Sequence, residues 1–569
     1  MVRTPLLRSL VRLAIDHRLA WERGVTPEAI RAARAAALDR WRRDGPPPVG
    51  LSRRDFLARA TGAAVALGAL AGLPGSTEAA ARGARAARAP RAPRVPRVAI
   101  VGGGLAGLTA ALTLADARVR STIYEASDRA GGRVHSNTRN YWRDGQVSEW
   151  CGELIDTDHK VVLGLARRFK LPLADLLAAQ APDAEETYYF AGHRYPKAEA
   201  DRDFQPVYQA LRRDIQAAGA RTTYASSSPA GVALDNMSVY SWIASRVAGG
   251  HASPLGRLLE VAYRIEYGAP TAEQSALNLV YMLGEQPKPG SLSIFGLSDE
   301  CYRLRDGNGE LPRAIAAALP PGTLRLGWRL VALARNPDGS LTLTFDTSHG
   351  VATARADHLI LALPFAVLRT LDYSHAGFDA LKDRAIRELG RGRNVKLHLQ
   401  FRTRYWSQPG READTGLSFS DTGYENTWDA SRGQSGASGL LVCFMAGDLD
   451  HAGGAPYSDA GSDPRVAEQA RAILRQLEPV WPGITAQWNG QATRSAAALD
   501  PNAACSYSYL RVGQYHAFGG YEGVRQGHIH FAGEHCSPDY QGFMEGAAAQ
   551  GARAARAVLD DLRGRRTGR

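Results

Sequence analysis

Three glycines and one glutamate near residue 100 have the spacing of a dinucleotide-binding turn. Gly102, Gly104 and Gly107 form the pattern GxGxxG, and Glu125 follows 18 residues after the last of them. Glycine here permits a tight turn, lets backbone N–H groups approach a pyrophosphate and allows a helix to pack closely on a strand. A carboxylate at this distance accepts hydrogen bonds from ribose hydroxyls. These residues, with Ala106 inside the turn, are expected to bind a dinucleotide, either NAD or FAD.

The elements that would position these residues follow one another in the required order. Val98–Val101 is short and mostly β-branched, residues 105–114 have helical spacing, and Ser121–Tyr124 has the composition of a second strand. A lone GxGxxG also occurs in other glycine-rich turns. The interpretation as a dinucleotide-binding turn therefore depends on the order of strand, helix, second strand and acidic residue. The sequence predicts an α/β fold that contains a Rossmann-like binding unit.

A second glycine motif follows Glu125 directly. The sequence ASDRAGGRVHS contains Gly131 and Gly132, and an NAD-binding unit has no need of this second glycine pair. Its arginines suit a phosphate because the planar guanidinium donates two parallel, charge-assisted hydrogen bonds. The stretch resembles the flavin-containing amine oxidase family, which includes monoamine and polyamine oxidases. The resemblance implies FAD as the cofactor, held here by Ala126, Arg129, Gly132 and Arg133.

The resemblance covers most of residues 97–560, in blocks that keep the family's order. Residues 149–159 resemble the segment that passes close to the flavin, with Cys151 where a glycine is usual. Residues 302–315 resemble the stretch that leads back into the FAD domain, and residues 528–559 form the strongest match. The further FAD contacts that the resemblance implies are Gly152, Glu153, Val331, Gly533, Glu534, Gly542, Phe543 and Met544.

The run after Gly542 is alanine-rich and predicts a helix through Leu559. Two-electron reduction leaves negative charge at one edge of a flavin ring, so positive potential there is favourable. The N-terminus of this helix would supply that potential through N–H groups near Phe543 and Met544. An ordinary strand-to-helix turn around Gly533 is the alternative interpretation.

Lys396 is the expected catalytic side chain. It lies in RNVKLHLQF, on a predicted strand, and matches the lysine that the family places near flavin N5 through a water. A cation there would favour reoxidation, because superoxide-like charge develops on dioxygen. The pattern alone favours a lysine that faces solvent on an edge strand, and the resemblance favours the catalytic role.

Cys505 raises the question of a covalent flavin. It precedes Gly513 by eight residues, the spacing at which monoamine oxidases carry a cysteine bonded to the cofactor. The next residue is Ser506, where a tyrosine is usual. We therefore expect FAD to bind without a covalent link, with a thioether through Cys505 as the alternative.

The resemblance implies oxidation of a small primary amine or diamine by hydride transfer to flavin N5. The imine hydrolyses to an aldehyde and ammonia, and dioxygen is reduced to hydrogen peroxide. Leu154, Tyr540 and Phe543 are the expected substrate contacts. Ser506 interrupts the pair of aromatic rings that some family members place around the amine, and Tyr540 or Tyr507 would compensate.

An L-amino acid oxidase is the close alternative. The snake-venom-like branch grips the substrate carboxylate with the arginine of a Gly-Pro-Met-Arg segment, and residues 152–155 read Gly-Glu-Leu-Ile there. An acidic Glu153 would repel a carboxylate and favour a second amino group, although another pocket arginine would overturn this argument. A flavin desaturase or isomerase of an apolar substrate, and a flavoprotein that only binds, are further alternatives on the same fold.

The first 97 residues hold all of the formal net charge of +12, with 19 arginines against 7 acidic residues. Because the rest of the chain is neutral, nucleic-acid binding is not expected. Residues 52–81 combine paired arginines, Phe-Leu, a short apolar run and an Ala-x-Ala end, the pattern of a twin-arginine signal. The run is too short for a permanent membrane anchor. We expect the twin-arginine machinery to export the protein to the periplasm or beyond.

The expected organisation alternates cofactor-binding and substrate-binding segments. Its parts are an N-terminal extension (1–51), the signal (52–81), a Pro/Ala/Arg linker (82–96), FAD-binding segments (97–158, 301–365 and 503–560) and segments of an interleaved α+β substrate domain (159–300 and 366–502). Five scattered cysteines without a CxxC pair argue against a metal site. The sequence does not determine whether the protein forms a homodimer.

Overall fold

The structure, a computed structural model, describes residues 95–564 except 139, 182, 409–413 and 448–453. The expected extension, the twin-arginine signal and all but the last two residues of the linker lie outside the described residues. Contacts separate Pro5–Val95 from a unit that includes Pro96–Arg569, and the elements below belong to this second unit. No helix among the described residues has both the length and the apolar character needed to cross a membrane.

The predicted strand Val98–Val101 is β1, the central strand of a five-stranded parallel sheet. Its residues are all buried, as in strands that are covered on both faces. The predicted second strand is β2 (Ser121–Tyr124), which pairs with β1, and both predictions are confirmed. The sheet order is β23-β13-β1-β2-β9, and the remaining strands are β9 (Leu324–Arg325), β13 (His358–Leu361) and β23 (Ile529–Phe531). Strands that are far apart in the sequence therefore share one sheet.

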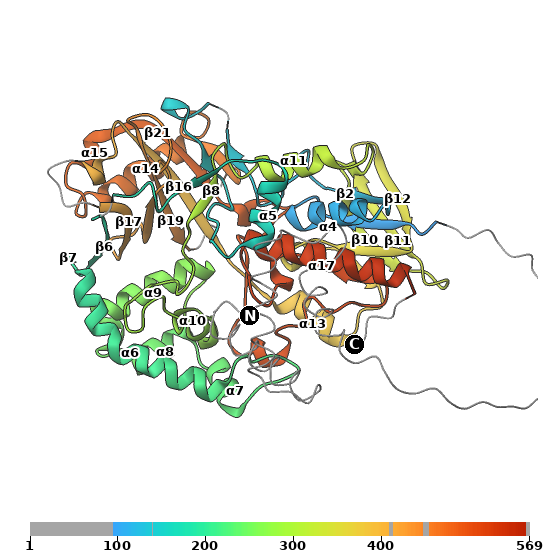
Figure 1. Cartoon of the computed structure of the whole chain (residues 1–569), viewed down its shortest axis with the longest axis horizontal. Coiled ribbons are helices and arrows are strands. Elements are labelled where there is room, and N and C mark those ends of the chain that lie inside the picture. The colour runs from blue at the N-terminus through green and yellow to red at the C-terminus, as the bar shows by residue number, and fades with distance from the viewer. Residues whose placement is uncertain (1–94, 139, 182, 409–413, 448–453, 565–569) are drawn as a thin grey trace, which may run out of the picture. The chain divides into compact units, whose positions relative to one another are not determined.

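Two helices pack together on this sheet. The helix predicted at residues 105–114 is α4 (Leu105–Asp116), and the helix predicted after Gly542 is α17 (Met544–Leu562). Figure 1 shows them side by side in blue and red. Close packing depends on glycine, because a Cβ atom on Gly551 would overlap the carbonyl oxygen of Ala106.

A second sheet has four strands in the order β12-β11-β10-β14. Its strands are β10 (Arg329–Arg335), β11 (Leu341–Thr347), β12 (Gly350–Ala356) and β14 (Asp372–His375). The pairing of β10 with β11 shifts register between Leu330 and Ala332. Val331 is therefore the extra residue of a β-bulge.

A third sheet has eight strands in the order β20-β21-β16-β19-β18-β17-β6-β7. Its strands are β6 (Glu185–Phe190), β7 (His193–Arg194), β16 (Asn394–Phe401), β17 (Asp414–Ser420), β18 (Asn426–Asp429), β19 (Gly439–Ala446), β20 (Tyr457–Asp459) and β21 (Trp488–Ser495). The strand predicted from Val395 to Phe401 is β16, which is confirmed. It lies between β19 and β21, so Lys396 is not on an edge strand.

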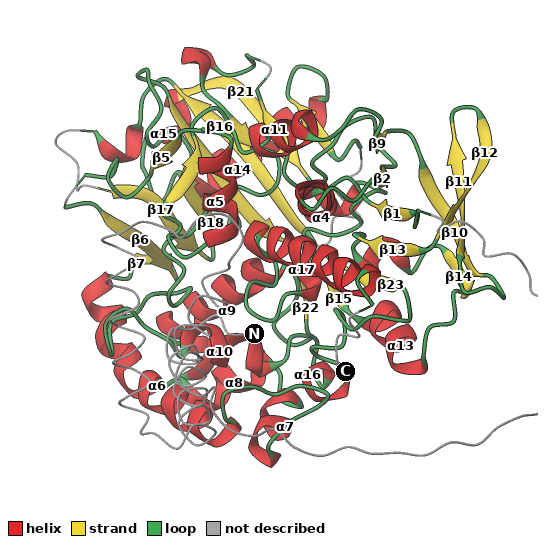
Figure 2. Cartoon of the chain, turned by 45° about the vertical axis from the view of Figure 1, so that its right-hand side comes forward, coloured by secondary structure: helices red, strands yellow, loops and turns green. Residues whose placement is uncertain are grey.

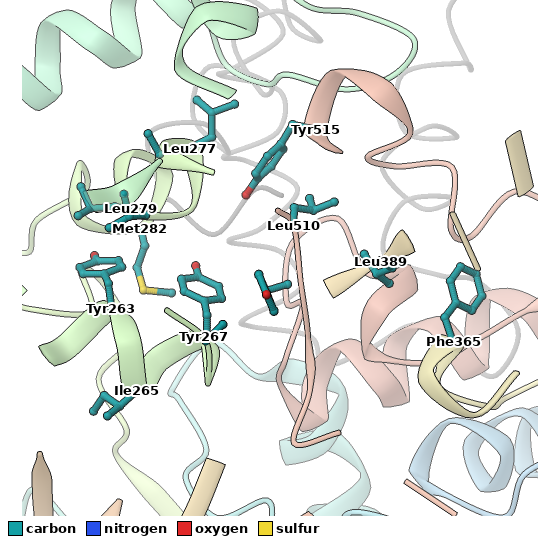
Figure 3. Close-up of a cluster of buried hydrophobic side chains, with 14 of the residues drawn as sticks. Tyr263, Ile265, Tyr267, Leu277, Leu279, Met282, Phe365, Leu389, Leu510 and Tyr515 are labelled. Atoms are coloured by element: carbon teal, nitrogen blue, oxygen red, sulfur yellow. The ribbon is translucent and has the colours of Figure 1, made fainter. Parts of the chain in front are cut away.

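Helices gather beside the eight-stranded sheet, as Figure 2 shows. They are α6 (Lys197–Ala218), α7 (Pro229–Asp235), α8 (Val239–Arg246), α9 (Pro254–Tyr267) and α10 (Ala276–Leu283). Helix α9 contacts β6, β17, β18 and β19. Figure 3 shows Tyr263, Ile265 and Tyr267 of α9 in an apolar cluster with Tyr515 and Leu510 from a later part of the chain. This cluster fixes α9 in place, and α9 in turn forms part of the wall of the cavity described below.

Smaller elements complete the described part of the chain. Three two-stranded pairs are β3 (Ser136–Asn137) with β4 (Ser148–Glu149), β5 (Leu173–Asp175) with β8 (Tyr302–Leu304), and β15 (Gly390–Arg391) with β22 (Ser508–Tyr509). The other α-helices are α5 (Lys160–Arg168), α11 (Glu310–Ala318), α12 (Phe365–Leu368), α13 (Ala380–Glu388), α14 (Pro464–Leu477), α15 (Ile484–Gln487) and α16 (Gln514–Ala517).

Candidate active site

A cavity of about 930 Å³ connects the five-stranded and eight-stranded sheets. On one side it is lined by residues that directly follow β1, β2 and β13, at the carboxyl ends of parallel strands. On the other side it is lined by residues of β16, β17, β18 and α9. Ligands of open α/β sheets bind at the carboxyl ends of the strands, so this cavity is the candidate active site.

The first glycine motif forms part of this wall. Gly102 has a φ of 102°, and a Cβ there would meet the backbone of Ala362. Gly104 is the N-cap of α4, no side chain caps this helix, and Gly104 and Ala106 line the cavity. Gly107 does not line it, because it packs directly on the carbonyl of Gly102. An uncapped helix N-terminus behind a glycine turn is an arrangement that binds a diphosphate.

The second glycine motif lies directly against the first. The Gly131 N–H donates to the Gly103 carbonyl at 2.9 Å, and a Cβ on Gly132 would lie 3.2 Å from the Cα of Gly104. The Arg129 guanidinium donates to the Gly132 carbonyl at 2.9 Å and holds the turn. The two glycine motifs therefore form one continuous surface of the cavity.

Glu125 is 7% exposed, and its carboxylate fastens the first glycine turn to the end of β2. One oxygen accepts from the Gly103 N–H at 2.5 Å, and the other accepts from the Ser127 N–H at 2.9 Å and hydroxyl at 2.7 Å. Two carboxylate oxygens offer about four acceptor sites, so capacity remains for hydroxyls of a ligand. Glu125 and Ala126 both line the cavity.

Arg133 and Glu534 connect the segments that precede and follow the substrate segments. The Arg133 guanidinium donates to the Ser506 carbonyl at 2.9 Å and to Glu534 Oε1 at 3.3 Å. Glu534 Oε2 accepts from the Ser508 hydroxyl and from the Gly542 N–H, both at 2.8 Å. These contacts hold the segment that leads into α17 beside the second glycine motif.

Lys396 lines the cavity as one half of a buried ion pair. Its Nζ donates to Glu153 Oε2 and to the Cys151 carbonyl, both at 2.7 Å, and the side chain is 9% exposed. The Trp428 indole donates to Glu153 Oε1 at 3.0 Å. Burial alone would raise the pKa of Glu153, but the Lys396 ammonium and these hydrogen bonds outweigh burial and lower it. An ammonium has three N–H donors, so Lys396 keeps one for the cavity.

The comparison with known families shows which family the chain belongs to. The sequence profile of the family described as "Flavin containing amine oxidoreductase" matches residues 105–559, which is most of the chain. The chain belongs to this family. Membership implies a flavin cofactor and a flavin-dependent oxidoreductase.

Individual members of the flavin amine oxidoreductase family resemble the chain over most of its length. The Flavin-dependent L-tryptophan oxidase RebO of Lentzea aerocolonigenes is 26% identical over 499 residues, which cover 81% of this chain and 97% of that protein. Cyclohexylamine oxidase from Brevibacterium oxydans IH-35A has a TM-score of 0.69 at 21% identity, over 83% of this chain and 100% of that chain. Putrescine oxidase bound to putrescine has a TM-score of 0.66 at 20% identity, over 82% and 99%. The chain therefore has the amine oxidase fold, a mixed α/β fold, which confirms the predicted fold class.

The residues around the cavity fit the flavin that the family implies. Helix α17 begins at the cavity, since Gly542, Phe543 and Met544 line it and no side chain caps the helix. Its first-turn N–H groups therefore present positive potential to a bound ring. Gly152, Glu153, Leu154, Gly533 and Glu534 also line the cavity.

Besides Gly107, two residues expected at this flavin oxidoreductase site lie outside the cavity wall. Val331 is the extra residue of the bulge in β10, and the wall ends at Leu330. The Tyr540 hydroxyl donates to Asp158 at 3.2 Å, and the Tyr540 ring packs edge-on against His159. Neither position follows from the local sequence, since each depends on a partner in another segment.

The structure also corrects the argument about Glu153. The sequence interpretation took it as an uncompensated negative charge that repels a carboxylate. Its carboxylate is instead paired with Lys396 and bonded to Trp428. The charge that distinguishes substrates must therefore come from other residues of the wall.

Sequence reasoning missed a set of charged residues and a tryptophan in the substrate half of the cavity. We define this half as the wall contributed by residues 159–300 and 366–502. Its described lining residues include Glu186, Glu266, Asp299, Glu300, Trp428, Arg432 and Asp500. They come from strands, a helix and loops without a shared motif, so the sequence offers no pattern that would find them together.

Proposed function

We propose that the protein binds FAD and oxidises the carbon–nitrogen bond of a small primary amine or diamine. The products are an imine, which hydrolyses to an aldehyde and ammonia, and hydrogen peroxide from dioxygen. A bound flavin supplies the redox chemistry, two-electron acceptance from the amine and two-electron transfer to dioxygen. The observation that carries the proposal is Lys396, a buried ammonium on the wall of the substrate half.

The protein's own residues place and stabilise charge. Glu153 and the Cys151 carbonyl fix the Lys396 ammonium, so that its remaining N–H can hold a water or dioxygen in the cavity. A preorganised cation stabilises developing negative charge more than a mobile one, because it needs no reorganisation. The N-terminus of α17 adds further positive potential to that of Lys396. Placement and electrostatics therefore supply the rate, and no acid or base is required.

The charge of the substrate half supports an amine rather than an amino acid. Its described lining residues include five carboxyl groups, of which Glu300 is protonated at pH 7 because burial raises its pKa to about 8, and two cations, of which Lys396 is already paired with Glu153. An excess of negative charge attracts an ammonium and repels a carboxylate. Arg432 favours the opposite conclusion, since an arginine at the wall could pair with a substrate carboxylate. Oxidation of L-amino acids is therefore the second candidate function.

Paired substrates separate these two functions. Peroxide production is measured for each L-amino acid and for the amine that it yields on decarboxylation, such as L-tyrosine with tyramine. We expect kcat/KM for the amine to exceed that for the amino acid by about tenfold or more, because a carboxylate would enter an acidic cavity. The opposite ratio, lost in Arg432→Gln, would establish the amino acid oxidase. No peroxide with either class would favour a desaturase or isomerase.

We propose that FAD is held without a covalent link. Cys505 is 2% exposed and is absent from the cavity wall, and the Arg133 guanidinium donates to its sulfur at 3.7 Å. We expect Cys505→Ser to keep both its flavin and its activity, because the thiol makes only two weak contacts, one with Arg133 and one with the Ala503 carbonyl at 3.5 Å. The measurement is flavin release on acid precipitation of both proteins. Flavin that stays with the wild-type precipitate but not with the variant would establish the thioether.

We also propose that the twin-arginine route exports the folded flavoprotein. The support is the sequence pattern around Arg53 and Arg54 alone. We expect Arg53→Lys with Arg54→Lys to leave the flavin-loaded protein in the cytoplasm, since this route reads the arginine pair. Fractionation of cells that express each form measures it. Equal export of both forms would overturn the proposal.

A further inference from the structure

Two histidines and an aspartate from three elements meet outside the candidate active site. His358 is the first residue of β13, His530 lies on β23, and Asp561 lies near the end of α17. Strands β13 and β23 pair in parallel with Ile360 opposite His530, so the side chains of His358 and His530 point to the same face of the sheet. Helix α17 contacts both strands (Figure 2). One possible ligand atom from each of the three residues lies within 4.8 Å of the others.

The distances between these atoms suit a bound metal ion. Asp561 Oδ2 lies 3.2 Å from His530 Nε2 and 3.8 Å from His358 Nδ1. Two ligands of a tetrahedral Zn²⁺ ion, each bonded at about 2.0–2.1 Å, lie about 3.4 Å from one another. Two imidazoles and one carboxylate are a ligand set that Zn²⁺ accepts, with water in the fourth position. An ion among the three side chains would therefore need only small movements.

Hydrogen bonding alone accounts for only one of the two histidines. His530 Nε2 lies 3.2 Å from Asp561 Oδ2, which is within hydrogen-bond range. His358 is 7% exposed, and its Nδ1 is buried without a hydrogen-bond partner among the described residues. The 3.8 Å from this nitrogen to Asp561 Oδ2 is too long for a hydrogen bond. A buried polar atom without a partner is unfavourable, and a metal ion would supply the partner.

The surroundings orient the carboxylate and give an ion access. Arg525 donates to Asp561 Oδ1 at 2.6 Å, so that Oδ2 faces the imidazoles, as outer partners of metal ligands do. A cavity of about 320 Å³ lies beside His530, and its wall includes Arg525, Arg553 and Arg556. These arginines oppose a cation, but Arg525 is paired with Asp561, Arg553 donates to a backbone carbonyl at 2.5 Å, and Arg556 is exposed to water, which screens its charge.

We propose that His358, His530 and Asp561 bind one Zn²⁺ ion, which fastens the end of α17 to β13 and β23. Helix α17 begins at Met544 on the wall of the flavin cavity, and Asp561 follows 17 residues later, about 25 Å along the helix. The ion therefore stabilises the fold and takes no part in amine oxidation. No sequence motif indicates this site, because its ligands lie on three elements that are far apart in the sequence.

The test adds Zn²⁺ to the purified flavoprotein after removal of metals with a chelator. We expect calorimetry to show about one ion bound per chain. Saturating Zn²⁺ should raise the thermal unfolding midpoint by about 2 °C or more, because a ligand that binds only the folded state stabilises it. The proportion of bound flavin should not change. Neither readout needs turnover, so this inference can fail while the proposed function holds. Absence of Zn²⁺ binding would overturn it.

Single substitutions identify the ligands. We expect His358→Gln and His530→Gln each to weaken Zn²⁺ binding by about 100-fold or more, since each removes one of three protein ligands. His528→Gln is the matched control. The His528 ring stacks on His358 at 4.6 Å, but its Nδ1 lies 3.1 Å from the Asp357 carbonyl, outside the ligand set. This variant should bind Zn²⁺ as the wild type does. Equal binding by all three variants, or an equal loss in all three, would contradict the assignment.

X-ray absorption at the zinc edge tests the assignment without any variant. The Zn²⁺-loaded wild-type protein should show two imidazoles and oxygen ligands at about 2.0–2.1 Å. A sulfur ligand, or fewer than two imidazoles, would place the ion elsewhere and overturn the proposal.

Discussion

Replacement of Lys396 by methionine is expected to slow reoxidation of the flavin by about 100-fold or more, the usual cost of removing a preorganised charge from a reaction centre. The Lys396 ammonium lines the cavity as part of the substrate half. Its loss removes the positive charge that would stabilise electron transfer to dioxygen. Stopped-flow mixing of the reduced enzyme with oxygen measures this step apart from amine oxidation.

The same substitution also has a structural effect, which must be separated from the first. Without Lys396, the carboxylate of Glu153 is buried with only the Trp428 indole as a side-chain partner. Removing one partner of a buried ion pair costs about 3–5 kcal/mol of folding free energy. Adding Glu153→Gln removes the unpaired charge, so the double variant should regain most of the stability. It should not regain the rate of flavin reoxidation.

Urea unfolding and stopped-flow kinetics on both variants make this distinction. Lys288→Met, which removes an exposed lysine, serves as the control and should change neither quantity. If the double variant recovered the reoxidation rate along with its stability, Lys396 would be a structural residue only.

Gly107→Ala is expected to abolish flavin binding and to lower the free energy of unfolding by about 3 kcal/mol or more. A Cβ at this position would overlap the carbonyl oxygen of Gly102, so α4 would have to move away from β1. That movement would displace the uncapped N-terminus of α4 from the cavity wall. The measurements are the ratio of flavin to protein absorbance after purification and the thermal unfolding midpoint.

Gly164→Ala is the matched control for this substitution. Gly164 lies inside α5, and a Cβ there would meet only the end of the Arg167 side chain, at 4.0 Å. Alanine in a helix interior is more favourable than glycine by about 0.5–1 kcal/mol. This variant should therefore keep its flavin and become slightly more stable. A Gly107→Ala protein that is yellow and as stable as the control would show that close packing of α4 is not needed.

Local sequence patterns were sufficient to predict the strands and helices around the glycine motifs. The strand Val98–Val101 and the helix after Gly104 follow from glycine spacing and apolar periodicity, and α17 follows from an alanine-rich run. These signals lie within a few residues of the features that they predict. The strand that carries Lys396 was also predictable, but its place between β19 and β21 was not, since pairing depends on distant segments.

The contacts between individual side chains could not be predicted from the sequence. The ion pair between Glu153 and Lys396 joins residues 243 positions apart, and neither flanking sequence indicates the other. Glu300 gives no local signal either, because its left-handed backbone is held by the hydrogen bond that its N–H donates to the distant Asp156. The bulge that moves Val331 out of the cavity wall is fixed by the strand opposite.

The central claim is that a flavin bound in this cavity oxidises amines. The most direct measurement is the visible spectrum of the purified protein in an anaerobic cuvette, before and after addition of a primary amine and again after admission of air. We predict a yellow protein whose flavin bands bleach with the amine and return with air, with release of hydrogen peroxide. A colourless protein, or flavin bands that bleach with L-amino acids and with no amine, would contradict the account.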